Sequence, residues 1–257
     1  MSWRVRVGSL LFGVSIALFG IQHLSYATGA PGPPPGPPWT AGVLAWAYIT
    51  GAVLVGCGAA ILANKWALPA AIVLGTMFLV RVALLVPGLA ADIRSPGKWT
   101  SLFELLAICG VSLVLAGALP RDNPELRRWD PALDRLIFAG RVLFAVSLVV
   151  FAIQHFMYPK FVATLVPAWI PARLFWAWFS GFAFAATAIS LAANRLVRLS
   201  STLLAIQFFS WLLVLHIPRA AAAWPNGDEW TSMLVALAMA GSGLILAGSP
   251  PRRSTET

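Results

Sequence analysis

Two Gln-His pairs, about 130 positions apart, are the first residues in this chain that could do chemistry. Gln22-His23 lies in the string FGIQHLSY, and Gln154-His155 lies in FAIQHFMY. Histidine titrates near neutral pH and has two ring nitrogens, so it can relay a proton, hydrogen-bond a quinone carbonyl or ligate a metal. The plainer interpretation is that both pairs tie the end of a helix to neighbouring backbone. Haem ligation is the weakest alternative, because axial histidines usually face each other from deeper positions.

His216 is a third candidate, in the string VLHIP. An ionisable side chain inside a membrane span is costly and indicates function by default. It could equally bond the backbone groups that Pro218 leaves free, because proline removes a donor from a helix. Beside the second Gln-His pair, it could form a polar spot at the mouth of an aromatic pocket. The expected ligand-binding residues of the chain are Gln22, His23, Gln154, His155, Trp169, Trp176, Trp178 and His216.

Arg81 and Glu104 are two charges expected inside the membrane at matching depths. The aligned residues of the second half are the apolar Leu212 and Val235, so both charges occur in one half and neither occurs in the other. A single charge in lipid is expensive. The sequence therefore predicts an Arg81–Glu104 ion pair facing the helix interior, with structural pairing favoured over a proton or substrate site.

Other catalytic signatures are missing from the sequence. Cys57 and Cys109 stand singly and form no C-x-x-C motif. There is no glycine-rich phosphate loop, acidic metal cluster or nucleophile elbow. We therefore assign no catalytic residue, expect no metal site and leave any cofactor unidentified, with a quinone as a candidate and haem as the less favoured one.

The elements that position these residues occur twice. After the Gln-His pairs, further matches follow in the same order at offsets of about 130. Trp39, Trp46, Gly51 and Asn64 recur as Trp169, Trp176, Gly181 and Asn194, and Pro87, Trp99, Gly110 and Gly117 recur as Pro218, Trp230, Gly241 and Gly248. A period this long indicates a duplicated domain rather than a solenoid. We expect one unit at 1–120, a cytoplasmic linker at 121–135, a second unit at 136–250 and a polar tail at 251–257.

Composition places these units in a membrane. Hydrophobic residues make up 59% of the chain and charged residues 11%, too few polar groups to coat a soluble protein of 257 residues. A helix crosses the hydrocarbon core with about 20 apolar residues. The sequence predicts eight such helices, near 6–26, 41–62, 67–89, 100–119, 136–157, 172–192, 199–219 and 230–249. The fold class is therefore all-α membrane protein.

Basic residues predict the orientation. Most of the eighteen lysines and arginines fall on one side if the N-terminus is cytoplasmic, which places both termini in the cytoplasm. Topology and lipid headgroups explain the net charge of +9 without nucleic acid. Four spans per unit give both units the same orientation, which implies a pseudo-twofold axis along the membrane normal. The first span has a counterpart in the second half, so we interpret it as a retained helix rather than a cleaved signal.

The second half contains the string IQHFMYPKFVATLVPAWIPARLFWAWFSG, then LVLHIP and W-T-S before a glycine-bearing last helix. With these strings it resembles the DoxX-like family of small four-helix bacterial membrane proteins. The first half matches more loosely and lacks VPAWIP and LHIP. The family takes its name from a subunit associated with thiosulfate:quinone oxidoreductase. The resemblance implies a bacterial inner-membrane protein with a redox-associated role.

The function expected from these observations is that of an accessory component of a redox system. It would bind quinone or lipid in an outward-facing pocket and carry no catalytic centre of its own. Its partners would be membrane lipids, a quinone and a membrane or peripheral oxidoreductase subunit. Two alternatives stay open: a small-molecule transporter whose repeats rock about the twofold axis, and a membrane-embedded enzyme acting on a lipid or isoprenoid.

Overall fold

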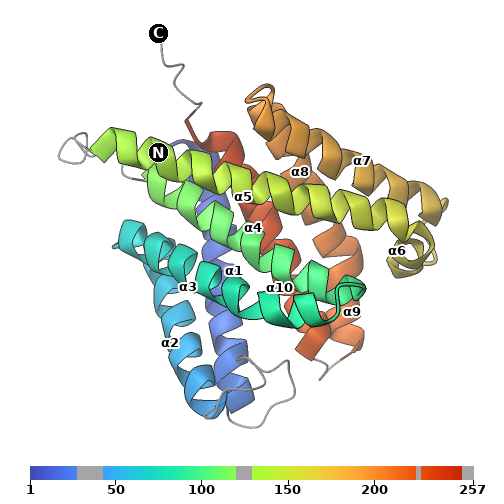
Figure 1. The fold of residues 1–257 in the computed structure, drawn as a ribbon, viewed down its shortest axis with the longest axis horizontal. Helices are drawn as coiled ribbons and strands as arrows, with labels where there is room; N and C mark the ends of the chain where they lie inside the picture. Colours follow the sequence, from blue (N-terminus) through green and yellow to red (C-terminus); the bar gives the residue numbers. More distant parts are fainter. Residues whose placement is uncertain (28–42, 120–128, 224–226, 251–257) are drawn as a thin grey trace.

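The fold is a bundle of helices, described here from a computed structural model at residues 1–27, 43–119, 129–223 and 227–250 (Figure 1). Within these ranges, eight helices are long and apolar enough to cross a membrane. The prediction of an all-α, multi-pass membrane protein is therefore confirmed. The proline-rich stretch at 30–39, most of the linker and the tail at 251–257 lie outside the described residues.

The membrane-spanning helices follow the predicted spans within a few residues. The seventh span is formed jointly by α8, the π-helix η3 and α9, and α6 is a short additional helix. The elements are α1 (Trp3–Ala27), α2 (Val43–Leu62), α3 (Ala67–Ala91), α4 (Pro96–Ala118), α5 (Asp130–Met157), α6 (Pro159–Leu165), α7 (Arg173–Ala192), α8 (Val197–Trp211), η3 (Leu212–His216), α9 (Ile217–Ala222) and α10 (Gly227–Gly248).

Helix boundaries differ from the prediction in two places. Helix α5 begins at Asp130 instead of 136, so the last residues of the expected linker are helical. The reason is local: Pro131 occupies the first turn, where its missing N–H costs nothing, and the Asp130 carboxylate suits the positive end of the helix dipole. In the seventh span, the wider π turn of η3 lies just before Pro218, whose ring would clash with an ordinary helical turn.

The last helix of each half packs against the first helix of the other half. Helix α4 contacts α5 extensively, and α10 contacts α1 in the same way, whereas α1 barely touches α4. Within the halves, α1 pairs with α2, α3 with α4, α5 with α7 and α8 with α10. Figure 1 shows α4 and α5 lying side by side, with α10 behind them. Neither half therefore forms its interior alone.

Glycines bring these helices into contact. A Cβ atom at Gly8 would lie 2.7 Å from the carbonyl oxygen of Gly241, and one at Gly140 would collide with the carbonyl oxygen of Gly110. Small residues allow this approach, and in lipid such close packing replaces the hydrophobic drive that joins helices in water. The contacts α1–α10 and α4–α5 are therefore backbone contacts.

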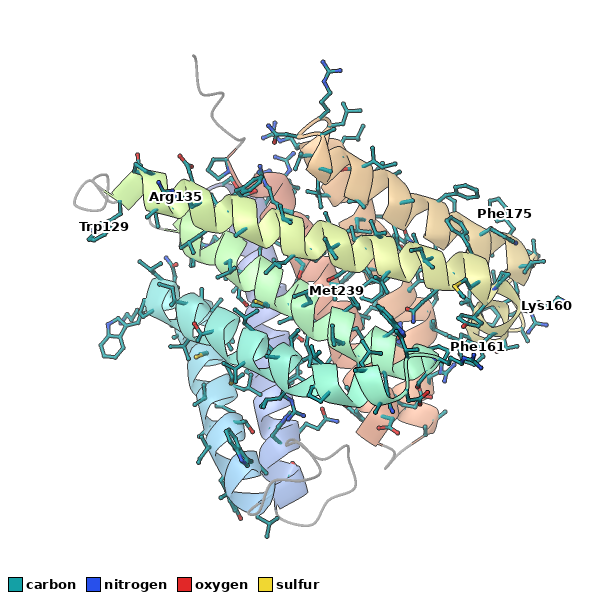
Figure 2. All side chains as sticks on the ribbon, in the orientation of Figure 1. Trp129, Arg135, Lys160, Phe161, Phe175 and Met239 are labelled. Carbon is teal, nitrogen blue, oxygen red and sulfur yellow. The ribbon has the colours of Figure 1, made fainter. Side chains whose placement is uncertain are left out.

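Apolar side chains lie both inside the bundle and on its surface, as membrane solvation allows. Met239 of α10 lies in the centre and is 1% exposed, whereas Phe161 of α6 is 65% exposed at the edge of the bundle (Figure 2). Apolar side chains on the outside face acyl chains, so exposure here does not indicate instability. The buried centre is lined by side chains from α1, α4, α5 and α10, among them Phe12, Ile16, Ile108, Leu115, Phe144, Leu148, Met239 and Ile245.

The glycine contact between α4 and α5 predicts the effect of one methyl group. Gly140→Ala should lower the free energy of unfolding in detergent by about 1–3 kcal/mol, because the added Cβ forces α5 away from the Gly110 carbonyl. Thermal unfolding of purified protein measures this. Gly56→Ala on α2 is the matched control: nothing lies within 4 Å of a Cβ there. Equal losses from the two substitutions would contradict the packing account.

Candidate functional site

The two glutamines of the Gln-His pairs join one half of the chain to the other. The Gln154 side-chain amide on α5 donates to the Pro96 carbonyl oxygen at 2.9 Å, and the Thr100 hydroxyl donates to Gln154 Oε1 at 3.2 Å. Both partners belong to the first turns of α4. Gln154 therefore anchors the beginning of α4 to the end of α5.

Gln22 makes the corresponding contact between α1 and α10. Its Nε2 donates to the Gly227 carbonyl oxygen at 2.9 Å and to Thr231 Oγ1 at 2.8 Å. Thr231 in turn donates to the same Gly227 carbonyl at 2.9 Å. The plainer interpretation of the Gln-His pairs thus holds for the glutamines: each one binds the first turn of a helix in the other half.

The two histidines are oriented alike. The Nδ1 atoms of His23 and His155 each lie 2.8 Å from the carbonyl oxygen four residues earlier, of Phe19 and Phe151. A carbonyl only accepts, so Nδ1 must carry the hydrogen. In the neutral ring, Nε2 is then an acceptor, and it has no hydrogen-bond partner among the described residues. Each ring therefore presents one fixed acceptor atom.

His155 lies against an aromatic group contributed by three helices. Its ring meets the edge of Phe184 of α7 at 5.0 Å between centroids and 89° between planes. Phe184 stacks on Phe208 of α8 at 5.5 Å and packs edge-on to Phe151 of α5 at 6.2 Å. His155 thus has a polar acceptor at the border of a ring-lined region.

The tryptophans expected beside His155 are distributed differently. Trp178 stacks on Phe156 at 5.5 Å, and Trp176 packs edge-on to Trp211 at 6.1 Å while its indole N–H donates to the Pro171 carbonyl at 3.2 Å. Trp169 is 73% exposed. None of the three has a ring contact with His155 among the described residues, so they fit the interfacial belt that tryptophan favours.

His216 lies in the π-helix η3, near an ion pair that the sequence analysis missed. Arg219 of α9 donates from Nε to Glu229 Oε2 at 3.0 Å and from Nη2 to Oε1 at 2.5 Å. Both charges lie close enough to act electrostatically on His216. Two features of the sequence could have indicated this pair: Glu229 is a carboxylate in the first turn of the last helix, and Arg219 is a basic residue directly after LHIP.

Arg81 and Glu104 occupy neighbouring helices, α3 and α4, and both are half-buried. No ion pair or hydrogen bond joins them in the part of the chain that the structure describes, so the expected pair is not formed there. Arg81 lies instead close enough to His23 of α1 for electrostatic interaction. Matching depth on adjacent helices was therefore not sufficient to bring the two side chains together.

Metal ligands do not gather in the described ranges. Within residues 1–27, 43–119, 129–223 and 227–250, no three histidines, cysteines or acids are grouped so that they could hold an ion. Cys57 is buried, and the Cys109 thiol donates to the Gly75 carbonyl at 3.2 Å between two packed helices. Both cysteines therefore occupy packing positions.

Comparison with known proteins gives one match. A family described as a domain of unknown function (DUF8561) matches residues 144–241, which extend from α5 into α10 and include His155 and His216. No curated protein and no solved structure matches the chain. The match coincides with the half that holds the aromatic group around His155.

The hydrogen bonds of Gln154 predict that removing its side-chain amide destabilises the protein, whereas removing the amide of Gln207 does not. Gln154→Leu should lower the free energy of unfolding by about 1–2 kcal/mol, because it removes two bonds between α4 and α5. Gln207→Leu on α8 is the matched control: the Gln207 amide nitrogen is buried without a partner in the described structure, so its loss should be neutral or stabilising. Thermal unfolding measures both. A larger loss from Gln207→Leu would contradict these assignments.

The separation of Arg81 and Glu104 predicts additivity. The losses of stability caused by Arg81→Leu and by Glu104→Val should add up to the loss in the double variant, to within about 0.5 kcal/mol. No bond joins the two side chains among the described residues, so neither substitution should change the effect of the other. A double-mutant cycle in detergent tests this. A coupling energy well above that value would show that Arg81 and Glu104 do form an ion pair.

Proposed function

We propose that the chain consists of two DoxX-like four-helix units in tandem, related by a pseudo-twofold axis along the membrane normal. The matched Gln22 and Gln154 bonds support this, since each glutamine binds the same place on the other unit's last helix. The Gly8–Gly241 and Gly140–Gly110 contacts support it in the same way. The turns after α2 and α7 also agree: Asn64 and Asn194 both have φ 51°.

The proposed location is the bacterial inner membrane, with both termini cytoplasmic. The Ser2 hydroxyl donates to the Gly248 carbonyl at 3.3 Å, so the beginning of α1 and the end of α10 lie at the same end of the bundle. The turns with Lys65 and Arg195 belong to this end too, because each follows two spans. An excess of basic residues favours the cytoplasmic side.

We infer that this protein binds a quinone or a related hydroxyl-bearing amphiphile at the outer end of its second unit. The observation that carries the proposal is the fixed His155 ring, whose Nε2 accepts at the edge of the Phe184–Phe208 stack. In its neutral form His155 accepts a hydrogen bond from a quinol hydroxyl. Once protonated, it donates to a quinone carbonyl. The flanking rings would pack against the ligand's ring and isoprenoid tail.

The proposed role is to support a redox partner. A single acceptor in an aromatic setting can hold a quinol but cannot transfer its electrons, so a membrane or peripheral oxidoreductase subunit would carry out the oxidation. Transport is less well supported, because carriers of this kind use paired helix breaks. The π-helix η3 interrupts the seventh span, whereas α3, its counterpart, continues as an α-helix through Pro87.

Ligand extraction tests the proposal. Full-length protein purified in mild detergent should carry a quinone or isoprenoid alcohol detectable by mass spectrometry. His155→Ala should lose most of it, because the ligand's polar end would have no partner. His23→Ala is the matched control, since His23 has the same backbone bond and lacks the Phe184–Phe208 stack. Retention of ligand by His155→Ala, or purification with bulk phospholipid only, would contradict quinone binding.

A further inference from the structure

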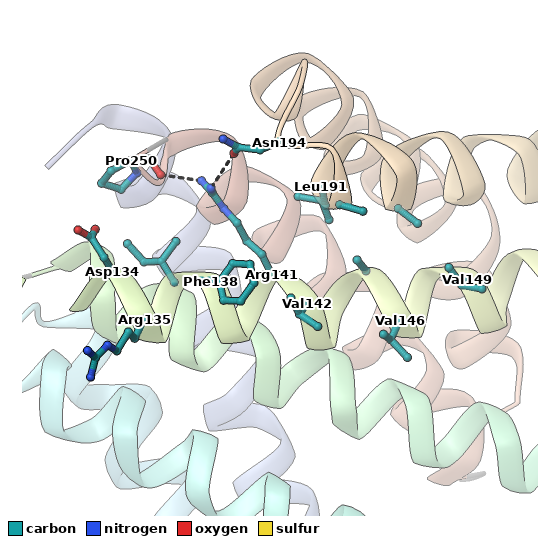
Figure 3. A pocket seen from close by; sticks show the side chains of 14 residues that line it. Asp134, Arg135, Phe138, Arg141, Val142, Val146, Val149, Leu191, Asn194 and Pro250 are labelled. Carbon is teal, nitrogen blue, oxygen red and sulfur yellow. Dashed lines mark hydrogen bonds between the residues drawn. The ribbon is translucent and has the colours of Figure 1, made fainter. Parts of the chain in front are cut away.

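A groove separates α5 from α7 at the end of the bundle opposite His155. It has a volume of about 750 Å³. Its apolar walls are formed by Val142, Val146 and Val149 of α5 and by Ala188, Leu191 and Ala192 of α7 (Figure 3). The three valines are 43–46% exposed, so the groove opens towards the surrounding acyl chains. From Val142 to Val149, its wall extends roughly 10 Å along the helix.

The two halves of the chain differ at this place for a visible reason. In the first half, α1 and α2 touch: a Cβ at Gly13 would lie 3.2 Å from the Gly58 carbonyl oxygen and 3.0 Å from Leu62 Cγ. The corresponding residues of the second half are Ala145, Ala188 and Ala192, which all line the groove. The methyl groups of Ala145 and Ala188 hold α5 and α7 apart. Ala192 is shorter than Leu62 and leaves the space between the helices unfilled.

A buried arginine closes one end of this groove. Arg141 is 5% exposed, and its counterpart in the first half is Ser9. Its Nη2 donates to the Pro250 carbonyl at 2.7 Å and to the Ser249 hydroxyl at 2.8 Å, and its Nη1 lies 3.4 Å from Asn194 Oδ1. Figure 3 shows the guanidinium directed towards Asn194 and Pro250, between α5 and the turn after α7.

The charge of Arg141 is not neutralised by these bonds. All its acceptors are uncharged, no carboxylate bonds to it among the described residues, and its Nε is buried without a partner there. Asp134 and Arg135 also line this end of the groove and carry opposite charges. A buried cation without a counter-ion is costly, and an anion would relieve that cost.

We propose that this groove is a binding site for one anionic phospholipid. The headgroup phosphate would bond the Arg141 guanidinium, which pairs strongly with phosphate oxygens. One acyl chain would lie along Val142, Val146 and Val149. The site combines an apolar channel open to lipid with a positive charge to which no carboxylate bonds in the described ranges, the arrangement that a negatively charged amphiphile complements. At the equivalent place in the first half, Gly13 packs against Gly58 and Leu62, and Ser9 stands where the second half has Arg141.

Native mass spectrometry of the full chain tests this site with two defined lipids. Phosphatidylglycerol and phosphatidylcholine with identical acyl chains are titrated separately into detergent-solubilised protein. The unmodified chain should retain a first phosphatidylglycerol molecule about fivefold better than phosphatidylcholine, given the strength of one arginine–headgroup attraction. Arg141→Ser, which installs the first half's residue, should reduce that preference to less than twofold. Arg198→Ser is the matched control, an exposed arginine at the same end of the bundle.

A second variant keeps the test decisive if Arg141→Ser does not fold. Ala192→Leu restores the side chain that fills the equivalent space in the first half and leaves Arg141 in place. It should lose the tightly held phosphatidylglycerol while its melting temperature stays equal or rises. Equal retention of both lipids by the unmodified chain would overturn the proposal. So would a preference that survives Arg141→Ser, or unchanged phosphatidylglycerol binding by Ala192→Leu.

Discussion

The backbone contacts of α4 with α5 and of α10 with α1 are the constraint on which the rest of the structure depends. Gly110, Gly140, Gly8 and Gly241 bring the helix axes close enough for carbonyl groups to touch the facing helix. In lipid, where apolar side chains gain little from meeting one another, this packing joins the two halves. It also brings the first turns of α4 and α10 within reach of the two glutamines, which lie near the C-terminal ends of α5 and α1.

The two halves of the chain share some side-chain contacts and differ in others. Both halves have the glutamine bonds and the same histidine orientation. The second half has the Phe184–Phe208 stack, a π turn at His216 and the Arg141 groove, whereas the aligned residues of the first half are Leu54 and Met77, Leu85, and Ser9. The groove lies where Ala145, Ala188 and Ala192 stand in place of Gly13, Gly58 and Leu62 of the first half. One half of the chain thus carries both proposed ligand sites.

The sequence predicted the spans well because their lengths and hydropathy are set by the membrane, and it located the helices to within a few residues. It did not predict η3, because a proline alone does not decide whether a π turn forms: Pro87, which aligns with Pro218, lies inside the unbroken α-helix α3. The positions of the charged residues in the sequence also did not predict which of them would pair. Equal depth suggested an Arg81–Glu104 bond, whereas Arg81 lies near His23, and Arg219 pairs with Glu229. Depth follows from residue number, but the direction of a side chain depends on helix rotation and packing.

The exchange of last helices between the halves is tested most directly by cysteine cross-linking in native membranes. The native cysteines are first replaced as Cys57→Thr and Cys109→Ala, the residues found at the aligned positions. Cysteines are then introduced in pairs at Gln22 with Thr231, and at Gln154 with Thr100. We expect both pairs to cross-link under mild oxidation and a pair at Gln22 with Thr100 to remain unlinked. Cross-linking of Gln22 with Thr100 in place of Thr231 would contradict the exchange of last helices, because each half would then close on its own last helix.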